Sequence, residues 1–423
     1  MKDDRLSAAR KKGAAMLAAV PRPAAEIPAS KAAKLVRKTA DLAIHGAPPL
    51  FVEPHHVGRP NIGNSERFLA RARDILERRW LSNNGPMLIE FEQRIVDRLG
   101  IKHCVAMCNG TIALEIATRA LELRGEVIVP SYTFVATAHA LQWQEITPIF
   151  ADIDPETQNL DPDSVRRMIT PRTTGIVGVH LWGRGAPVEQ LAEVAAVNNL
   201  KLMFDASHGF GCSHHGTLLG NFGDCEVFSF HATKFFNTFE GGAVVTNDDT
   251  LAAKMRLMRN FGFSDYDRVI YPGTNGKMTE IAAAMGLTNL EDLDEFVIIN
   301  RRNYQAYRDE LRSIRGLKML EYDDAEKNNY QYIVLEVASA FPVSRDRVVE
   351  VMHAENVLAR KYFWPGVHNM EPYRSYYPHA GLVLPNTKHV ADRVVVLPTG
   401  TAIAPEDIRD IASVLRVLAS GRA

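Results

Sequence analysis

A lysine stands close behind an apolar run in the segment FSFHATK, residues 228–234. Lysine prefers full exposure, so a lysine held against a buried strand is unusual. An amine in such a place has a lowered pKa, and its unprotonated form can make a Schiff base with an aldehyde. Ser229, on the same segment, offers a hydroxyl that can donate to a phosphate oxygen. Lys234 is therefore the first candidate for a chemical role.

A carboxylate ends a second apolar run, at Asp205 in FDASHG. A buried carboxylate needs a cationic partner or several hydrogen-bond donors. A protonated pyridine nitrogen is one such partner, whereas an aspartate that caps a helix is the structural alternative. His208 follows three residues later. It can hydrogen-bond a cofactor oxygen, or it can be an ordinary structural histidine.

Two further segments follow predicted strands. Asn109-Gly110-Thr111 opens a helix, where free N–H groups and the positive helix end favour an anion such as phosphate. The same tripeptide is also an ordinary helix cap and turn. Phe134, after the strand at 126–129, can lie flat on a planar ring or simply pack in the core. Gly241 and Gly242 indicate the close approach of another backbone or a ligand.

Pyridoxal phosphate needs a combination of groups that these segments supply. It requires an amine for its aldehyde, a carboxylate for its pyridine nitrogen, a cradle for its phosphate and a surface on which its ring stacks. Each segment alone is weak evidence, but together they predict this cofactor. We assign no metal-ligand set from the sequence.

The elements that must position these groups follow an alternating pattern from about residue 50. Strands are expected at 104–108, 126–129, 147–150, 175–180, 201–205, 226–229 and 243–246, with helices such as 111–123 and 188–198 between them. This alternation predicts a mainly parallel, seven-stranded sheet covered on both faces. Ligands bind at the carboxyl ends of such strands, which is where the candidate residues stand.

The second half of the chain predicts a smaller α/β unit. A long helical run over 278–311 is followed by a strand at 332–337 and by helices at 345–355 and 404–418. We therefore expect a basic N-terminal extension at 1–48, a large cofactor-binding domain at 49–290 and a small C-terminal domain at 291–423. The extension has ten Lys and Arg residues against four Asp and Glu.

The bulk composition excludes some classes of function. The 423 residues carry a net charge of −1, which does not indicate a nucleic-acid or membrane-surface protein. No apolar run reaches the ~18 residues of a membrane span, and the charged N-terminus is unlike a signal peptide. Four cysteines without a CxxC pair suggest reduced core thiols. We expect a cytoplasmic enzyme.

The chain resembles the DegT/DnrJ group of sugar aminotransferases over residues 50–423. The resemblance rests on these motifs: NGTIAL at 109–114, PSYTFVATAHA at 130–140, VHLWG at 179–183, FDASHG at 204–209, GNFGDCEVFSFHATK at 220–234, EGGAVVTND at 240–248 and GTNGKM at 273–278. It implies the aspartate aminotransferase-like fold, fold type I of the pyridoxal-phosphate enzymes.

The resemblance also implies residue roles. Lys234 binds the cofactor and moves the proton, and Asp205 pairs with the pyridine nitrogen. The remaining cofactor-binding positions are His208, Phe134, Gly110, Thr111, Ser229 and Asn275. Asn275 matches an asparagine that reaches the phosphate of the neighbouring subunit, so a homodimer with shared active sites is implied. Lys277 departs from the family's usual arginine, and no substrate contact is carried over to it.

The implied reaction moves an amino group from L-glutamate, which becomes 2-oxoglutarate, to a nucleotide-linked keto sugar. WLSNNGP at 80–86, ATAHALQWQ at 136–144 and VGVHLWGR at 177–184 look most like the enzymes that aminate dTDP-4-keto-6-deoxyglucose at carbon 4. Those enzymes supply deoxyaminosugars for antibiotics and surface glycans. The alternatives are a 3-aminotransferase and a non-catalytic cofactor-binding regulator. A related branch of 3-dehydratases has histidine in place of the lysine, and Lys234 argues against it.

Overall fold

The computed structural model describes residues 34–421, and a seven-stranded sheet forms its centre. The strand order is β2-β10-β9-β6-β5-β3-β4, and within this sheet only β10 runs antiparallel to its neighbours. The seven predicted strands and the mainly parallel sheet are confirmed. The strands are β2 (His103–Met107), β3 (Glu126–Pro130), β4 (Thr147–Ala151), β5 (Thr173–Val179), β6 (Lys201–Asp205), β9 (Cys225–Ser229) and β10 (Gly242–Thr246).

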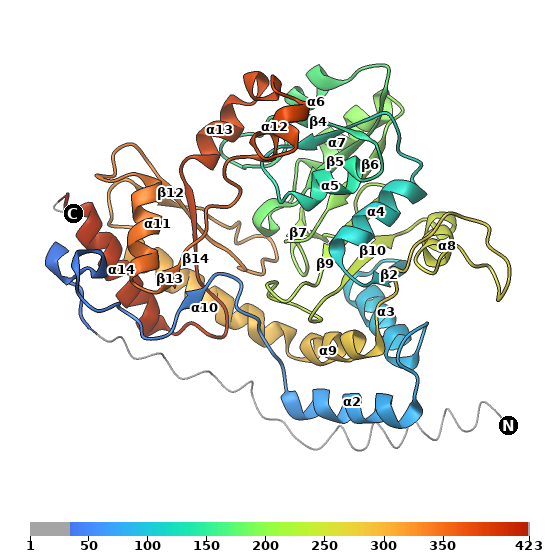
Figure 1. Cartoon of the computed structure of the whole chain (residues 1–423), viewed down its shortest axis with the longest axis horizontal. Helices are drawn as coiled ribbons and strands as arrows, with labels where there is room; N and C mark the ends of the chain where they lie inside the picture. Colours follow the sequence, from blue (N-terminus) through green and yellow to red (C-terminus); the bar gives the residue numbers. More distant parts are fainter. Residues whose placement is uncertain (1–33, 422–423) are drawn as a thin grey trace.

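Successive side chains of the strands enter different cores. Helices cover both faces of the large sheet (Figure 1). Val127 and Met203 pack under α4, α5 and α8. Their sequence neighbours Ile128 and Phe204 pack under α6 and α7, while Ala106 faces α3. The covering helices are α3 (Pro86–Leu99), α4 (Gly110–Ala120), α5 (Ala136–Gln142), α6 (Pro162–Met168), α7 (Val188–Val197) and α8 (Asp249–Met258).

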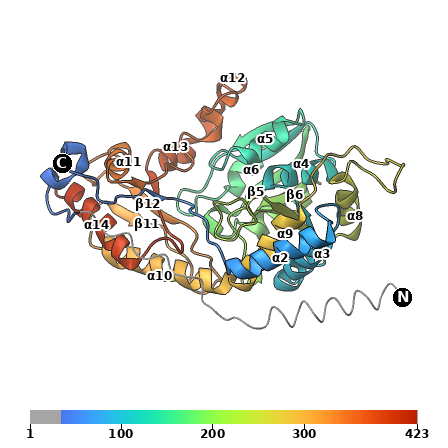
Figure 2. The ribbon, with the colours of Figure 1, turned by 60° about the horizontal axis from the view of Figure 1, so that its bottom comes forward.

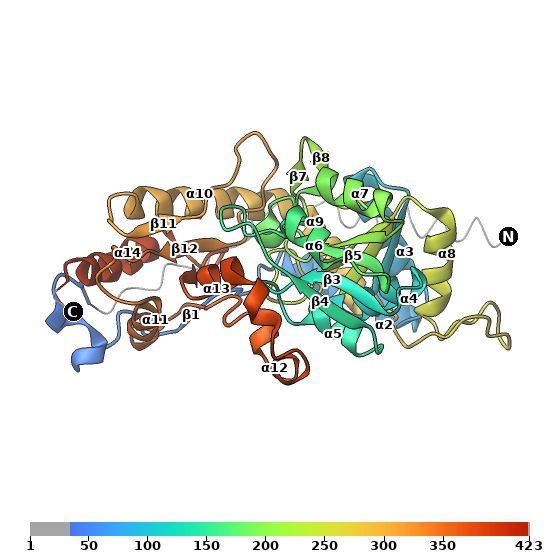
Figure 3. The ribbon, with the colours of Figure 1, turned by 90° about the horizontal axis from the view of Figure 1, so that it is seen from above.

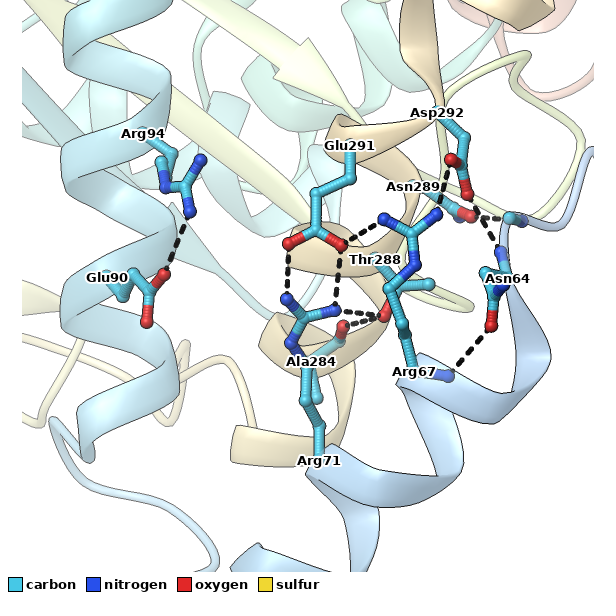
Figure 4. Close-up of polar contacts among 11 residues, drawn as sticks. Asn64, Arg67, Arg71, Glu90, Arg94, Ala284, Thr288, Asn289, Glu291 and Asp292 are labelled. Atoms are coloured by element: carbon cyan, nitrogen blue, oxygen red, sulfur yellow. Dashed lines mark hydrogen bonds and ion pairs between the residues drawn. The ribbon is translucent and has the colours of Figure 1, made fainter. Parts of the chain in front are cut away.

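Two consecutive helices, α9 (Glu280–Glu291) and α10 (Leu293–Leu311), lead from the large sheet to a second unit. The prediction of one helical run over 278–311 is wrong at Asp292, whose φ of −108° and ψ of 8° are not helical. Its carboxylate accepts hydrogen bonds from the Asn64 N–H at 2.8 Å and the Arg67 guanidinium at 2.6 Å (Figure 4). These contacts tie the bend to the start of α2 (Ser65–Arg78).

A buried arginine holds α2 along α9. The Arg71 guanidinium donates to Thr288 Oγ1 at 2.8 Å and to Glu291 Oε1 at 2.5 Å (Figure 4). A buried charge is costly unless it is paired and hydrogen-bonded, and here it is both. Helices α2, α3 and α9 consequently form one layer on the outside of the large sheet (Figure 2).

The second unit is built on a three-stranded antiparallel sheet, β11-β12-β14, packed against α10, α11 and α14. The strand and the two helices expected in this region are present. Its elements are β11 (Leu317–Met319), β12 (Ile333–Val337), α11 (Arg345–Ala354), α13 (Pro385–Ala391), β14 (Val394–Leu397) and α14 (Pro405–Ala419). The short helix α12 (Tyr373–Tyr376), between α11 and α13 in the chain, packs instead on the core of the large sheet, where Tyr373 is buried.

The start of the described chain packs on this second unit. Val36, Leu42 and Phe51 are buried in its core, and β1 (His55–His56) pairs with β13 (Val357–Leu358). The segment lies at the same end of the molecule as α11 and α14 (Figure 1). Residues 1–33 of the predicted extension lie outside the described residues. The domain limits at 48 and 290 stay a prediction.

Among residues 34–421, none of the helices has the length and apolar character that crossing a membrane would require.

Candidate active site

A cavity of about 280 Å³ opens at the carboxyl ends of the strands of the large sheet. It is lined by seven of the eight residues that the sequence predicts for the site: Gly110, Thr111, Phe134, Asp205, His208, Ser229 and Lys234. The residues come from segments that follow β2, β3, β6 and β9. Their meeting is the consequence of parallel strands ending on one edge.

The first turn of α4 forms one wall of the cavity. Asn109 caps this helix, and its side-chain oxygen accepts the Ile112 N–H at 2.8 Å. The N–H groups of Gly110 and Thr111 have no acceptor within the helix, because the first turn of any helix lacks them. Asn109-Gly110-Thr111 is thus both a helix cap and a set of donors that can hold a phosphate.

Two glycines let backbone segments meet at this wall. A Cβ on Gly110 would lie 2.9 Å from Ser229 Cβ, and one on Gly242 would lie 2.7 Å from the Asn109 carbonyl. Any side chain at either position would push α4 away from the ends of β9 and β10. The close backbone approach predicted from Gly241-Gly242 is therefore present, and it places the Ser229 hydroxyl beside the start of α4.

Lys234 lies in a loop that leaves β9 and returns to β10. Phe230 closes the base of this loop, since its N–H donates to the Gly241 carbonyl at 2.8 Å and its carbonyl accepts the Thr238 N–H at 2.9 Å. Lys234 is partly exposed where it lines the cavity, and burial lowers the pKa of its amine from 10.5 to about 8, although the Asp205 carboxylate acts in the opposite direction. About a tenth of the amine is therefore unprotonated and nucleophilic at pH 7, and about half at pH 8.

Asp205 is buried at the end of β6 and held by two donors. Thr137 Oγ1 donates to one carboxylate oxygen at 2.8 Å, and the Ser207 N–H donates to the other at 3.0 Å. Thr133 Oγ1 lies 3.0 Å from Thr137 Oγ1 and extends the chain of hydroxyls. These bonds fix the orientation of the carboxylate toward the cavity that it lines.

His208 is a buried, neutral imidazole. Burial lowers its pKa well below the ordinary value, and the nearby Lys234 cation acts in the same direction. The backbone N–H of Trp182 donates to His208 Nδ1 at 3.2 Å, so the proton of the imidazole ring is assigned to Nε2. The imidazole is nearly parallel to the Trp182 and Phe363 rings, with ring centroids 5.8 and 6.0 Å away, and those two rings lie 5.4 Å from each other, so the three rings form one cluster. His208 can therefore donate one hydrogen bond without carrying charge.

Phe134 is 57% exposed while it lines the cavity. Core packing, the other interpretation of this residue, does not fit such exposure.

Asn275 does not line the cavity of its own chain. It lies beside Asn260, and its side-chain oxygen accepts from Lys277 Nζ at 2.5 Å. Lys277 also lies 4.5 Å from the centre of the Phe261 ring.

Sequence reasoning missed several residues of the site. Tyr332, Tyr362 and Phe363 form a wall contributed by the second unit, more than 90 residues along the chain from Lys234. No local pattern marks them. Thr137 belongs to the segment 136–144, but nothing in that segment marks it, because its partner Asp205 lies 68 residues further along the chain.

The residues present fit pyridoxal phosphate. The cavity offers an amine of lowered pKa, a carboxylate fixed by donors, an exposed aromatic face and a helix start that side chains cannot fill. These are the groups that its aldehyde, ring nitrogen, ring face and phosphate require.

A match to a family model shows which protein family this chain belongs to. The model of the DegT/DnrJ/EryC1/StrS aminotransferase family matches residues 63–416. The chain belongs to this family. The predictions of an aminotransferase of fold type I with pyridoxal phosphate as its cofactor are thereby confirmed. The roles of the individual residues stay predictions.

Individual relatives are similar over most of their length. The solved structure of DesI, in the presence of its TDP-sugar product, shares 49% identity and a TM-score of 0.87, and the match covers 90% of this chain and 97% of DesI. The dTDP-4-amino-4,6-dideoxy-D-glucose transaminase of Shigella dysenteriae is 36% identical over 86% of this chain and 99% of its own. The GDP-perosamine synthase of Caulobacter vibrioides is 36% identical over 75% and 86%.

Replacing Thr137 should weaken cofactor binding. The Thr137→Val variant keeps the side-chain volume but removes the donor to Asp205 Oδ2. A hydrogen bond to a charged group contributes about 1.5–3 kcal/mol, so we expect about 10- to 100-fold weaker binding of pyridoxal phosphate by the apoenzyme, measured by absorbance titration. Thr137→Ser keeps the hydroxyl and serves as the control. Equal affinities of the two variants would contradict this role.

The pKa of Lys234 predicts an unusual pH profile. Only the unprotonated amine reacts with an aldehyde, so with a pKa of about 8 the apoenzyme should combine with pyridoxal phosphate about fivefold faster at pH 8 than at pH 7. From pH 8 to pH 9 the gain should be less than about twofold. Stopped-flow absorbance measures the rate. A steady tenfold rise per pH unit through pH 9 would instead indicate an ordinary lysine.

Proposed function

We propose that this protein transfers an amino group from L-glutamate to carbon 4 of dTDP-4-keto-6-deoxyglucose, giving dTDP-4-amino-4,6-dideoxyglucose. The observation that carries the chemistry is the presence of Lys234 and Asp205 in one cavity beside the open start of α4. The substrate rests on the relatives. The Shigella protein is named for this 4-amino sugar, and DesI was solved with a TDP-sugar product.

Asp205 and Lys234 have separate roles in the reaction. When bound, pyridoxal phosphate supplies a ring that withdraws electrons from the substrate carbon bearing the nitrogen. Asp205, held by Thr137 and the Ser207 N–H, keeps the ring nitrogen protonated. Lys234 Nζ would take the proton from that carbon and deliver it to the carbon of the cofactor's former aldehyde group, a role that its pKa near 8 permits at neutral pH.

The other cavity residues bind and orient. The N–H groups of Gly110 and Thr111 and the Ser229 hydroxyl hold the phosphate. Neutral His208 donates from Nε2 to the ring oxygen, and Phe134 covers one face of the ring. The aromatic wall of Tyr332 and Phe363, which packs against His208, covers a further part of the cavity from water.

The site is expected to be completed in a homodimer. Asn275 lies outside the cavity of its own chain, and its family counterpart reaches the phosphate of the neighbouring subunit. The Asn275 amide is held in place by Lys277, which leaves its amide NH₂ as the group to offer a partner.

The competing functions are less well supported. A regulator that only binds the cofactor has no need of a lysine amine whose pKa is lowered to about 8. The Caulobacter relative is named for a GDP-linked sugar. The product experiment below therefore compares a dTDP-sugar with a GDP-sugar.

Product analysis tests the reaction. The purified enzyme is incubated with L-glutamate and either dTDP-4-keto-6-deoxyglucose or GDP-4-keto-6-deoxymannose, and the new amine is located by NMR. We expect amination of the dTDP-sugar at carbon 4. The Lys234→Ala variant should give no product, and borohydride should fix the cofactor covalently to the native protein but not to this variant. Amination at carbon 3, or preference for the GDP-sugar, would overturn the substrate assignment.

Mixed dimers test the shared site. Chains carrying Lys234→Ala and chains carrying Asn275→Ala should each have low activity. In a mixed dimer, one active site contains both substitutions, and the other contains the native Lys234 and the native Asn275. Random mixing makes about half of the dimers mixed, so we expect about a quarter of the native activity to return. Activity no greater than the sum of the two separate variants would show that Asn275 serves its own chain or none.

A further inference from the structure

A second cluster of potential ligands lies outside the active site. Among residues 34–421, Glu189, His214 and His215 form the one set of three or more His, Cys, Asp or Glu side chains whose ligand atoms all lie within 4.8 Å of one another. Glu189 is in the first turn of α7. The two histidines belong to the hairpin of β7 (Ser213–His214) and β8 (Thr217–Leu218), which lies beside α7 (Figure 3).

Both histidines face the same carboxylate. His214 Nε2 lies 3.1 Å from one oxygen of Glu189, and His215 Nδ1 lies 3.1 Å from the other. Adjacent residues of a strand normally point to opposite faces. Here His215 has a left-handed backbone with φ of 48°, and its ring stacks on that of His214 at 4.1 Å between centroids. The turn thus brings two imidazoles to one side.

The hairpin is supported from behind. The Glu326 carboxylate accepts the Gly216 N–H at 3.1 Å and the Ser213 hydroxyl, and the same hydroxyl accepts the Lys327 N–H at 2.7 Å. Gly185 leaves room for the half-buried imidazole, since a Cβ there would lie 2.4 Å from His214 Nδ1. The hairpin and the His214 ring are therefore held by the fold, whereas Glu189 and His215 are exposed side chains that meet through their contacts with each other and with His214.

We propose that Glu189, His214 and His215 bind a divalent transition-metal cation of the zinc class. Imidazole nitrogen and carboxylate oxygen are ligands that Zn²⁺ takes in proteins. With bonds of about 2.1 Å, two ligands of a tetrahedral ion lie about 3.4 Å apart, close to the 3.1 Å between each ring nitrogen and its carboxylate oxygen. The exposed side of the cluster leaves the remaining position to water.

The bound cation would act as a clamp and not as a catalyst. None of the three residues lines the active-site cavity. The hairpin that they anchor contacts residues 326–327, and the neighbouring Asn329 side chain donates to the His208 carbonyl at 2.8 Å. Binding ties α7, the hairpin and this segment together, so the folded protein gains stability while the chemistry is unchanged.

The test is a titration of the tag-free holoenzyme with ZnCl₂, followed by calorimetry and by the melting temperature. We expect one equivalent to bind at the cluster and saturating zinc to raise the melting temperature by at least about 2 °C. His215→Gln and Glu189→Gln, both at exposed positions, should each weaken binding at least tenfold and abolish the shift. His379→Gln, an exposed histidine of another region, should behave as the native protein does. The kcat of all three variants should be unchanged.

Two results would overturn the proposal. One is the absence of zinc-dependent heat and of any melting shift in the native protein. The other is an equal response to zinc in the native protein, His215→Gln and Glu189→Gln. Either result would identify the cluster as an ordinary pair of carboxylate–imidazole hydrogen bonds.

Discussion

The site depends on a contact between backbones that leaves no room for a side chain. Gly110 meets Ser229 at the end of β9, and Gly242 meets Asn109 at the end of β2, at distances where a Cβ would collide. β10 makes this possible because it runs antiparallel between β2 and β9 and so joins two strands whose carboxyl ends point the same way. The helix start and the lysine loop are adjacent for this reason.

Desolvation sets the charges inside the cavity. Lys234 loses part of its affinity for a proton because its burial disfavours the charged form, and the carboxylate of Asp205 restores only some of that loss. His208 experiences burial and the lysine cation together, and both keep its imidazole neutral. A base, an anion and a neutral donor consequently share one small space, and each is fixed by hydrogen bonds or packing from residues with no direct chemical role.

Most of the strands of the large sheet, and seven of the eight residues that meet in the candidate site, could be predicted from the sequence because each signal was local. In each case an apolar run predicts a strand. Lys234, Asp205 and Gly110 each stand at or shortly after the end of such a run. The break at Asp292 could not be predicted, since it depends on Asn64 and Arg67 more than 220 residues earlier. The wall of Tyr332 and Phe363 and the pairing of His215 with Glu189 were missed for the same reason: distant contacts and a left-handed turn create them.

The burial of Glu355 has a consequence for how the protein is made. Its carboxylate accepts the N–H groups of Ala43 at 2.6 Å and Leu50 at 2.7 Å and pairs with Lys34 at 2.9 Å. Ala43 and Glu355 are 312 positions apart. During synthesis from the N-terminus, the segment around residues 34–51 therefore leaves the ribosome long before its binding place exists. Its apolar side chains cannot be buried in the second unit until nearly the whole polypeptide has emerged.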